Sequence, residues 1–289
     1  MSSVVGIPVL RGGEHVKKFS ERRRELGRFL RDRRSRVRPS DVGLLEGPRR
    51  RVAGLRREEV ATLAGVGVTW YTMLENGTAA GVSAATLSAI ARALQLNAGE
   101  VAYLHRLAEE READEPRATV RPATSRALAA IEWAPAYVCT SQWLVLEWNR
   151  AMSLVWPIGA PGGAPFNIIA LMFRDPAVRA MHGERFPAFG RTLVAMVRSA
   201  VASHIDDTIY LAMCDDLRRD PLFAAAWDDY DVAHPVSSIA TMVESPAVGT
   251  FAYETLTLDV PDGDGHWIVI QVPDPSSSAR LRAALSGTR

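Results

Sequence analysis

Basic side chains are concentrated in one stretch near the N-terminus of this 289-residue chain. Between Lys17 and Arg57 there are 16 Lys and Arg residues against 5 Asp and Glu residues. Guanidinium and ammonium groups bind phosphate oxygens, so such a stretch is typical of a surface that holds a nucleic-acid backbone. A solvated helix face is the alternative for the same composition. The elements that must position these side chains decide between the two.

The stretch Leu55–Gly77 predicts two short helices joined by a tight turn. Apolar residues recur with helical spacing on both sides of Gly65-Val66-Gly67, and glycine supplies the positive φ that such a turn usually needs. Glu58 and Glu59 suit the first turn of the first helix, and Asn76-Gly77 is a typical helix end. Two helices joined in this way form a helix-turn-helix, with an ordinary helical hairpin as the alternative.

This stretch resembles the lambda-repressor-like helix-turn-helix of the XRE superfamily. The matching residues are Glu58-Glu59-Val60-Ala61, Ala64-Gly65-Val66-Gly67 and Leu74-Glu75-Asn76-Gly77. Gly67 stands where that family usually has a serine to cap the second helix, and glycine is the weaker cap by roughly a few tenths of a kcal/mol. The resemblance implies an all-α domain that binds a double-stranded DNA operator.

Docking of a helix-turn-helix places side chains early in the second helix against base edges. The predicted DNA-contacting residues of this helix are Gly67, Val68, Thr69, Thr72 and Met73. Val68 suits a thymine methyl group, and Thr69 or Thr72 suits a base edge or a phosphate. We expect Trp70 to be partly exposed and Tyr71 to be buried.

Five arginines around the first helix of the helix-turn-helix are predicted to hold phosphates. Phosphate contacts position a protein on DNA without specifying sequence. Arg56 and Arg57 stand at the start of that helix. Arg49, Arg50 and Arg51 stand in the long loop before it, where they suggest an arm that reaches phosphate or the minor groove. Simple disorder of this loop is the alternative.

Three further helices complete the predicted DNA-binding domain. The first covers Phe19–Arg36, with Ser20 as its N-cap and a flexible tail over residues 1–16 before it. Ser83 caps the next, which extends to about Leu94. Asn97 and Glu100 form a capping box that begins the last. The domain is predicted at 17–112, and a charged, proline-bounded linker follows at 113–122.

A different pattern begins at Thr124 and predicts strands as well as helices. A helix over Arg126–Trp133 is followed by a β-hairpin of Ala136–Thr140 and Gln142–Trp148 and then by several helices. The closing strands are Ser237–Glu244, Gly249–Val260 and His266–Val272. This is the order of a PAS-like α+β domain, a five-stranded antiparallel sheet with helices over one face, here at 123–285.

The second half resembles the ligand-binding domain of MmyB-like transcription regulators. The residues that carry this resemblance are Pro135-Ala136-Tyr137-Val138, Trp143, Glu147-Trp148-Asn149, Asn167-Ile168-Ile169 with Phe173, Asp175-Pro176, Pro246 with Val248-Gly249, and Tyr253-Glu254-Thr255-Leu256. Such domains are thought to hold a fatty-acid-like molecule, so the resemblance implies a small apolar ligand at Trp148, Asn149, Phe173, Arg174 and Tyr253. Family members often carry arginine or another large residue at the place of Ala170, and Arg174, one turn away, is the predicted substitute.

The aromatic and methionine side chains of this half are predicted to line a cavity between sheet and helices. Asn149 offers a donor to a carboxylate or carbonyl, and Tyr253 offers a hydroxyl on an apolar body. The alternative is that these side chains simply fill the core.

No grouping typical of catalysis or metal binding is visible in the sequence. The scattered histidines His182, His204, His234 and His266 lack metal-ligand spacing, and Gly159, Gly162 and Gly163 lack the spacing of a nucleotide-binding loop. We therefore expect no enzyme, no metal and no cofactor apart from the apolar ligand.

The sequence contains no apolar run long enough to span a bilayer, and we expect no signal peptide. Cys139 and Cys214 lack CxxC spacing and are expected to be reduced, as in a cytoplasmic protein with no membrane partner. The predicted function is a sequence-specific, homodimeric transcription regulator whose ligand modulates DNA binding. Two alternatives stay open: a C-terminal domain that serves only for dimerisation or partner binding, and one with a cryptic enzymatic activity.

Overall fold

The computed structural model describes residues 12–45, 52–79, 81–109, 119–205, 207–233, 238–261 and 265–287, with side chains from Glu21 onward except that of Thr208. Contacts divide the chain into two compact units, Met1–Glu112 and Ala113–Arg289. Among the helices in these ranges, none has the length and apolar character needed to cross a membrane.

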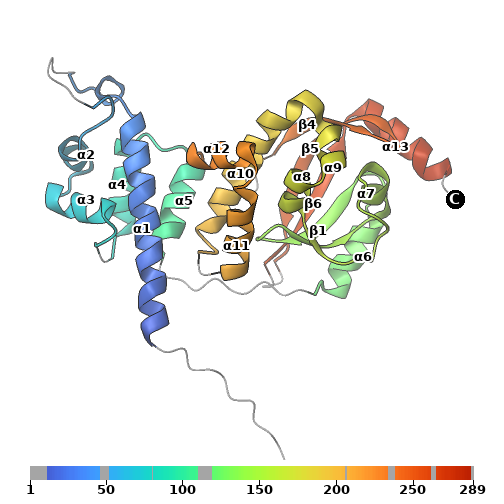
Figure 1. The fold of residues 1–289 in the computed structure, drawn as a ribbon, viewed down its shortest axis with the longest axis horizontal. Helices are drawn as coiled ribbons and strands as arrows, with labels where there is room; N and C mark the ends of the chain where they lie inside the picture. Colours follow the sequence, from blue (N-terminus) through green and yellow to red (C-terminus); the bar gives the residue numbers. More distant parts are fainter. Residues whose placement is uncertain are drawn as a thin grey trace, which may run out of the picture. The chain divides into compact units, whose positions relative to one another are not determined.

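The N-terminal unit is helical throughout its described part (Figure 1). Its elements are α1 (Gly12–Arg36), the 3₁₀ turn η1 (Pro39–Val42), α2 (Arg57–Ala64), α3 (Val68–Glu75), α4 (Ala84–Ala93) and α5 (Ala98–Ala108). The five predicted α-helices are present. The prediction for the start of α1 was wrong, because the helix begins at Gly12 and Ser20 lies in its interior.

The core of this unit forms where α1 packs against α3 and α5 while α2 packs against α4. Leu26, Phe29 and Leu30 make up the buried stripe of α1, and the Phe29 ring meets the Tyr103 ring edge-on at 5.0 Å between centroids. The predicted capping box of α5 is confirmed: Asn97 Oδ1 accepts the Glu100 N–H at 3.0 Å, and Glu100 Oε2 accepts the Asn97 N–H at 2.9 Å. Local signals of this kind fix the helix boundaries around the helix-turn-helix.

The C-terminal unit is built on one antiparallel sheet with the strand order β3-β2-β1-β6-β5-β4. The strands are β1 (Ala136–Thr140), β2 (Leu144–Trp148), β3 (Phe166–Asn167), β4 (Ala240–Ser245), β5 (Gly249–Asp259) and β6 (His266–Pro273). The helices are α6 (Pro122–Ala130), α7 (Arg150–Val155), α8 (Ile168–Arg174), α9 (Pro176–His182), α10 (Phe186–Val201), α11 (Thr208–Leu217), α12 (Pro221–Asp228) and α13 (Pro275–Gly287), with the 3₁₀ turn η2 (Gly183–Arg185) before α10.

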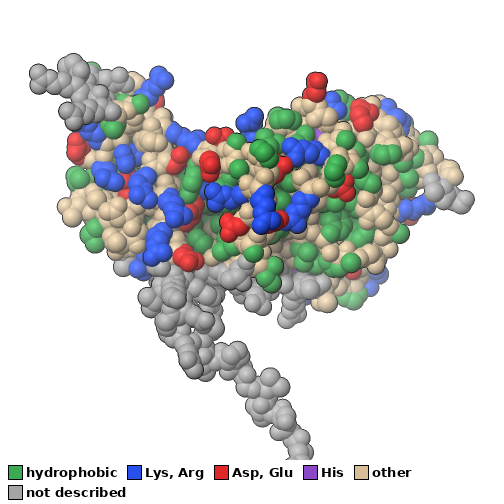
Figure 2. Space-filling model, in the orientation of Figure 1, with side chains coloured by type: hydrophobic (Ala, Val, Ile, Leu, Met, Phe, Trp, Pro, Cys, Tyr) green, Lys and Arg blue, Asp and Glu red, His purple; other side chains and the backbone are tan. Residues whose placement is uncertain are grey.

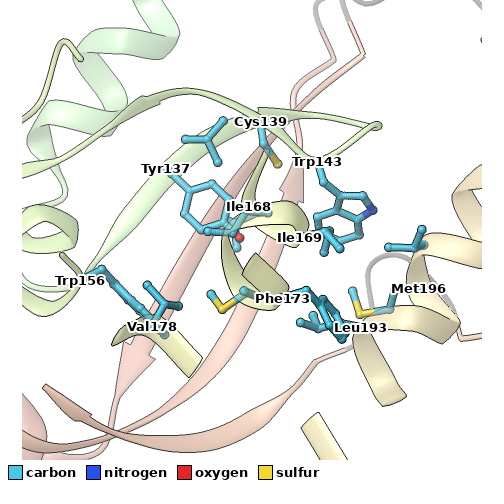
Figure 3. Close-up of a cluster of buried hydrophobic side chains, with 14 of the residues drawn as sticks. Tyr137, Cys139, Trp143, Trp156, Ile168, Ile169, Phe173, Val178, Leu193 and Met196 are labelled. Atoms are coloured by element: carbon cyan, nitrogen blue, oxygen red, sulfur yellow. The ribbon is translucent and has the colours of Figure 1, made fainter. Parts of the chain in front are cut away.

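Most of the helices cover one face of this sheet, and Figure 1 shows α8 and α9 lying across the strands. Alternate residues of the central strands, including Tyr137, Phe251 and Val269, enter the main core on that face. Figure 3 shows Tyr137 and Cys139 of β1 directed toward Ile168 of α8. This layered core is where the sequence predicts the ligand cavity.

Three features of the C-terminal unit differ from the prediction. The sheet has six strands, because the two-residue strand β3 pairs with Leu144 and Val145 of β2, and two residues are too short to show a period. Helix α6 begins at Pro122 and packs Leu128 on the opposite sheet face, so the helices do not lie on one face alone. Helix α13 was missed because Leu281 is its one fully buried apolar side chain.

Candidate DNA-binding and ligand-binding sites

The turn between α2 and α3 presents α3 with one buried and one exposed face. Gly65 closes α2 with a φ of 67°, the left-handed conformation that favours glycine. Tyr71 and Leu74 enter the core at 0% and 2% exposure, while Val68 and Met73 keep 44% and 42% of their surface in solvent. Thr69 is exposed as well. The predicted base-contacting residues therefore share the outer face of α3.

Two residues of this predicted face are limited in what they offer to DNA. The Thr72 side chain is partly buried, and its hydroxyl donates to the Val68 carbonyl at 2.8 Å, so in this arrangement the hydroxyl can offer DNA only its acceptor lone pairs. Gly67 has an extended backbone before α3, and a Cβ built there would meet nothing within 4 Å. A serine cap would fit at this position.

The arginines at the start of α2 differ in their freedom. Arg56 is exposed, and its guanidinium reaches the Glu58 carboxylate at 3.5 Å. Arg57 is 41% exposed, but its Nε donates to Glu75 Oε2 at 2.7 Å. Because the Arg57 guanidinium group is held through Nε, its two Nη atoms are positioned at the surface. Arg49, Arg50 and Arg51 lie outside the described residues.

Glu75, at the end of α3, is the centre of a charged cluster that joins three helices. Its side chain is fully buried. Arg34 of α1 donates from Nε to Oε1 at 2.6 Å and from Nη2 to Oε2 at 3.2 Å, and its Nη1 donates to the Leu55 carbonyl at 2.8 Å. Arg57 binds the same carboxylate from α2. The cluster therefore fixes the recognition helix against both of its neighbours.

Further basic side chains follow α1, and Figure 2 shows them on the visible face of the N-terminal unit. The exposed arginines of the described part of this helix are Arg24, Arg28, Arg31 and Arg36. Two of them pair within the helix: Arg28 lies 3.6 Å from Glu25, and Arg36 lies 3.0 Å from Asp32. The guanidinium sides of these pairs are in solvent, at 61% exposure for Arg28 and 41% for Arg36, so both arginines are accessible to phosphate.

The predicted ligand residues lie in four separate places in the C-terminal unit, with Arg174 apart from the other three groups. Trp148 and Asn149 line an open cleft of about 810 Å³ between α6, α7 and α13. Tyr253 lines a cavity of about 40 Å³ between the sheet and the helices. Phe173 lies in the core, its ring 5.5 Å from the Phe186 ring and 5.1 Å from the Phe223 ring. The sequence predicted one shared pocket, but the fold does not bring these residues together in one pocket.

Asn149 uses all the hydrogen bonds of its amide within the protein. Its Oδ1 accepts the N–H groups of Ala136 at 3.1 Å and Met152 at 2.9 Å. Its Nδ2 donates to the carbonyls of Ile131 at 2.6 Å and Ala134 at 2.8 Å. This side chain caps α7 and clamps the loop before β1, so donation to a ligand would require breaking one of these bonds.

Arg174 does not point into either cavity. It is 54% exposed, forms an ion pair with Asp216 of α11, and lines a shallow depression together with Asn167 and Pro176. Ala170, which lies beside it in that depression, is partly buried. The structure therefore does not bring the predicted substitute cation to the cavity that Tyr253 lines.

A scan against protein-family models identifies both units. The model of the MmyB-like transcription regulator ligand-binding domain matches residues 120–285, more than half of the chain. The chain belongs to the MmyB-like transcription regulators. A helix-turn-helix domain model matches residues 25–104 of the same chain. A comparison with curated proteins finds no match.

This MmyB-like regulator has two functional candidates that the sequence did not single out. Glu75 was read as part of a motif, although its helical spacing from Tyr71 and Leu74 places it on the buried face of α3. Tyr137 was read as a resemblance position, yet it lines the same cavity as Tyr253. Alternation along β1 would have placed Tyr137 on the core face, but its neighbour across the sheet depends on strand order.

The two cysteines of the regulator are buried. Cys139 and Cys214 are free thiols, and burial raises the pKa of Cys139 far above its ordinary value and that of Cys214 to about 12. Across the described ranges, no three His, Cys, Asp or Glu side chains are grouped closely enough to hold a metal ion.

Proposed function

We propose that this regulator binds an operator as a homodimer through the outer face of α3, and that a small apolar ligand of the C-terminal unit modulates this binding. The carrying observation is the exposure of Val68, Thr69 and Met73 on a helix whose other face is fixed by the core and by Glu75. One recognition helix covers only a few base pairs, so affinity calls for two half-sites about one helical turn apart.

The cavity between sheet and helices supports the ligand part of the proposal. It is enclosed by side chains of the main core, with Met172 and Met196 among its walls. Methionine is flexible and adapts to irregular shapes, so these walls can separate when an apolar molecule enters. We expect no catalytic step and no resident metal or cofactor, and we expect the protein to act in the cytoplasm.

Selection of a binding site from random duplexes, followed by mutagenesis, tests the DNA part. Thr69→Ala should weaken the selected operator about tenfold through lost base contact, while binding to unrelated duplexes stays unchanged. Arg56→Ala should weaken all duplexes alike and reduce the slope of log K against log salt by about 0.9. Thr62→Ala is the matched control, because Thr62 is exposed on α2 and its hydroxyl is occupied by the Glu58 carbonyl.

The same measurements show which results would contradict the proposal. If Thr69→Ala affects operator and unrelated duplex equally, α3 does not read sequence. Solvent extraction of the purified regulator and mass spectrometry identify the ligand, which is then added back to the operator assay. If no apolar molecule binds or changes operator affinity, the C-terminal unit is an assembly module without a receptor role.

A further inference from the structure

Two buried tyrosines, whose hydroxyls have no hydrogen-bond partner among the described residues, line the cavity between the sheet and the helices. Tyr137 is 6% exposed and Tyr253 is 5% exposed. Both line the cavity of about 40 Å³, and among the described residues neither hydroxyl has a hydrogen-bond partner. Neither hydroxyl is among the fully buried unpaired polar atoms of the described residues, so each stays accessible from the cavity and free to donate. A ligand that accepts hydrogen bonds can pair with both.

Other polar groups of this cavity are consistent with an acceptor ligand. Gln271 accepts the Trp156 indole N–H through Oε1 at 2.7 Å, which leaves its amide N–H₂ as a donor. Thr255 and Thr257 add hydroxyls from β5. The indole N–H of Trp143 is also buried and unpaired, but Figure 3 shows it on the side of the ring away from Tyr137.

Every described side chain that lines the cavity is uncharged at neutral pH. Aliphatic, aromatic and methionine side chains of α8 and α10 form the wall opposite the sheet. The arginines of these two helices are Arg174, Arg191 and Arg198, and none of them lines the cavity. Arg174 pairs with Asp216, and Arg198 lies over the Trp227 and Tyr230 rings and donates to the Trp227 carbonyl. A carboxylate placed beside Tyr137 and Tyr253 would therefore be buried without a counter-charge, which is strongly unfavourable.

We propose that the ligand of this site is a neutral apolar molecule with a carbonyl oxygen, of the ketone, ester or amide class, which accepts hydrogen bonds from Tyr137 and Tyr253. This inference rests on the proposed function, in which the cavity between sheet and helices receives the ligand, and it specifies the chemistry of the ligand head. It also predicts that a fatty acid enters this site only in its protonated form.

The titratable groups around the cavity whose pKa values are shifted stay neutral between pH 7 and pH 9. On β1 and β5, burial raises the pKa of Tyr137 and Tyr253, with smaller effects of Cys139 and Tyr253 on Tyr137. Burial also raises the pKa of Cys139 on β1. On α9, His182 stacks on Phe189 at 4.4 Å between centroids, and burial lowers its pKa, so it is neutral above pH 7. The α8 and α10 arginines do not line the cavity, and His266 of β6 lies on the opposite sheet face from Trp267 and Val269.

The test compares 2-tridecanone with dodecanoic acid on the ligand-free, full-length protein by calorimetry at pH 7 and pH 9. The two probes have the same chain and differ by a methyl group in place of a hydroxyl. The ketone should bind with the same Kd at both pH values. A carboxyl group titrates near pH 4, so the protonated fraction of the acid, and with it the affinity, should fall about 100-fold from pH 7 to pH 9.

Substitution of the phenols distinguishes a ligand-binding hydroxyl from a structural one. Tyr253→Phe and Tyr137→Phe should each weaken the ketone about fivefold to tenfold, while the melting temperature of the ligand-free protein stays equal or rises, because no internal hydrogen bond is lost. Tyr210→Phe is the matched control. Tyr210 is buried in the same unit, but its hydroxyl donates to the Val197 carbonyl at 3.4 Å, so its loss should lower the melting temperature and leave ketone binding unchanged.

The outcomes separate this inference from the proposed function. If the acid binds at pH 9 as tightly as the ketone, the site accepts a carboxylate and the inference is wrong, while the proposed apolar ligand stands. If both Tyr→Phe variants bind the ketone like the wild type, the phenols do not hold the ligand head and the inference is again wrong. If neither probe binds at either pH, the cavity is not a receptor for apolar molecules and the proposed function fails.

Discussion

The Glu75 cluster provides a stability prediction for the helix-turn-helix that can be worked out from its geometry. Glu75→Gln keeps the shape of the side chain but removes the charge that Arg34 and Arg57 share. The carboxylate is fully buried and meets its nearest Arg34 and Arg57 nitrogens at 2.6 and 2.7 Å. Loss of one partner from a buried ion pair costs about 3–5 kcal/mol, mostly because the other partner is left uncompensated.

Solvent access to the arginines places the expected value at the lower end of that range. Arg57 is 41% exposed and can turn into water, whereas Arg34 is 17% exposed and stays anchored on the Leu55 carbonyl. We therefore expect Glu75→Gln to destabilise the N-terminal unit by about 3 kcal/mol. For a unit of this size that corresponds to a fall in melting temperature of roughly 12–24 °C.

Calorimetry of the full chain measures this change, and hydrogen exchange with mass spectrometry assigns it to α1, α2 and α3. Arg57→Gln is the matched control. It removes only the more exposed partner and leaves the two bonds from Arg34, so it should cost about 1 kcal/mol or less. If Glu75→Gln costs no more than Arg57→Gln, and amide protection of α1 and α3 is unchanged, the carboxylate does not hold these helices together.

Two further predictions concern acid stability and assembly. Burial alone would raise the pKa of Asp220. Hydrogen bonds from Arg179 and from the first amides of α12 outweigh this effect and hold the pKa below its ordinary value of 3.8. The ionised Asp220 carboxylate therefore stabilises the fold above about pH 4, and this stabilisation is lost as the pH falls through the lowered pKa. The difference in urea stability between wild type and Asp220→Asn should therefore shrink from pH 6 to pH 2.5, and an equal difference at both would show that the pair is irrelevant. For assembly, sedimentation with footprinting should show a dimer that protects two half-sites about 34 Å apart, and a monomer that protects one half-site would rule this out.

The helix-turn-helix was predictable because its signals are local. Gly65, Ser83 and the Asn97–Glu100 capping box act within a few residues of themselves, and each lies at the end of the helix that it was expected to bound. The start of α1 was not predictable, because Gly12 and Gly13 give no cap signal and Ser20 lies inside the helix. The burial of Glu75 was accessible in principle from its helical spacing, but its two partners are 41 and 18 residues away.

The ligand site was less predictable, since it depends on which strands become neighbours. Trp148 and Tyr253 are both aromatic residues at positions taken from the family resemblance, but the first lies at the end of β2 in an open cleft and the second lies on β5 beside a small cavity. Tyr137 comes close to Tyr253 only because β6 is placed between β1 and β5. Asn149 satisfies its amide through backbone groups of a loop whose path no periodicity indicates.

The size of the cavity constrains how a ligand can act on this regulator. Sites for small molecules usually measure about 300–1,000 Å³, and the cavity beside Tyr137 and Tyr253 measures about 40 Å³. The sheet side is fixed by continuous pairing from β1 through β6 to β5, so an entering molecule must displace the helical wall of α8 and α10. Under the proposed function, free and liganded forms would then differ in the position of these helices. A ligand changes DNA affinity only to the extent that it binds one arrangement of the regulator better than another, and in this proposal filling the cavity would itself move the wall.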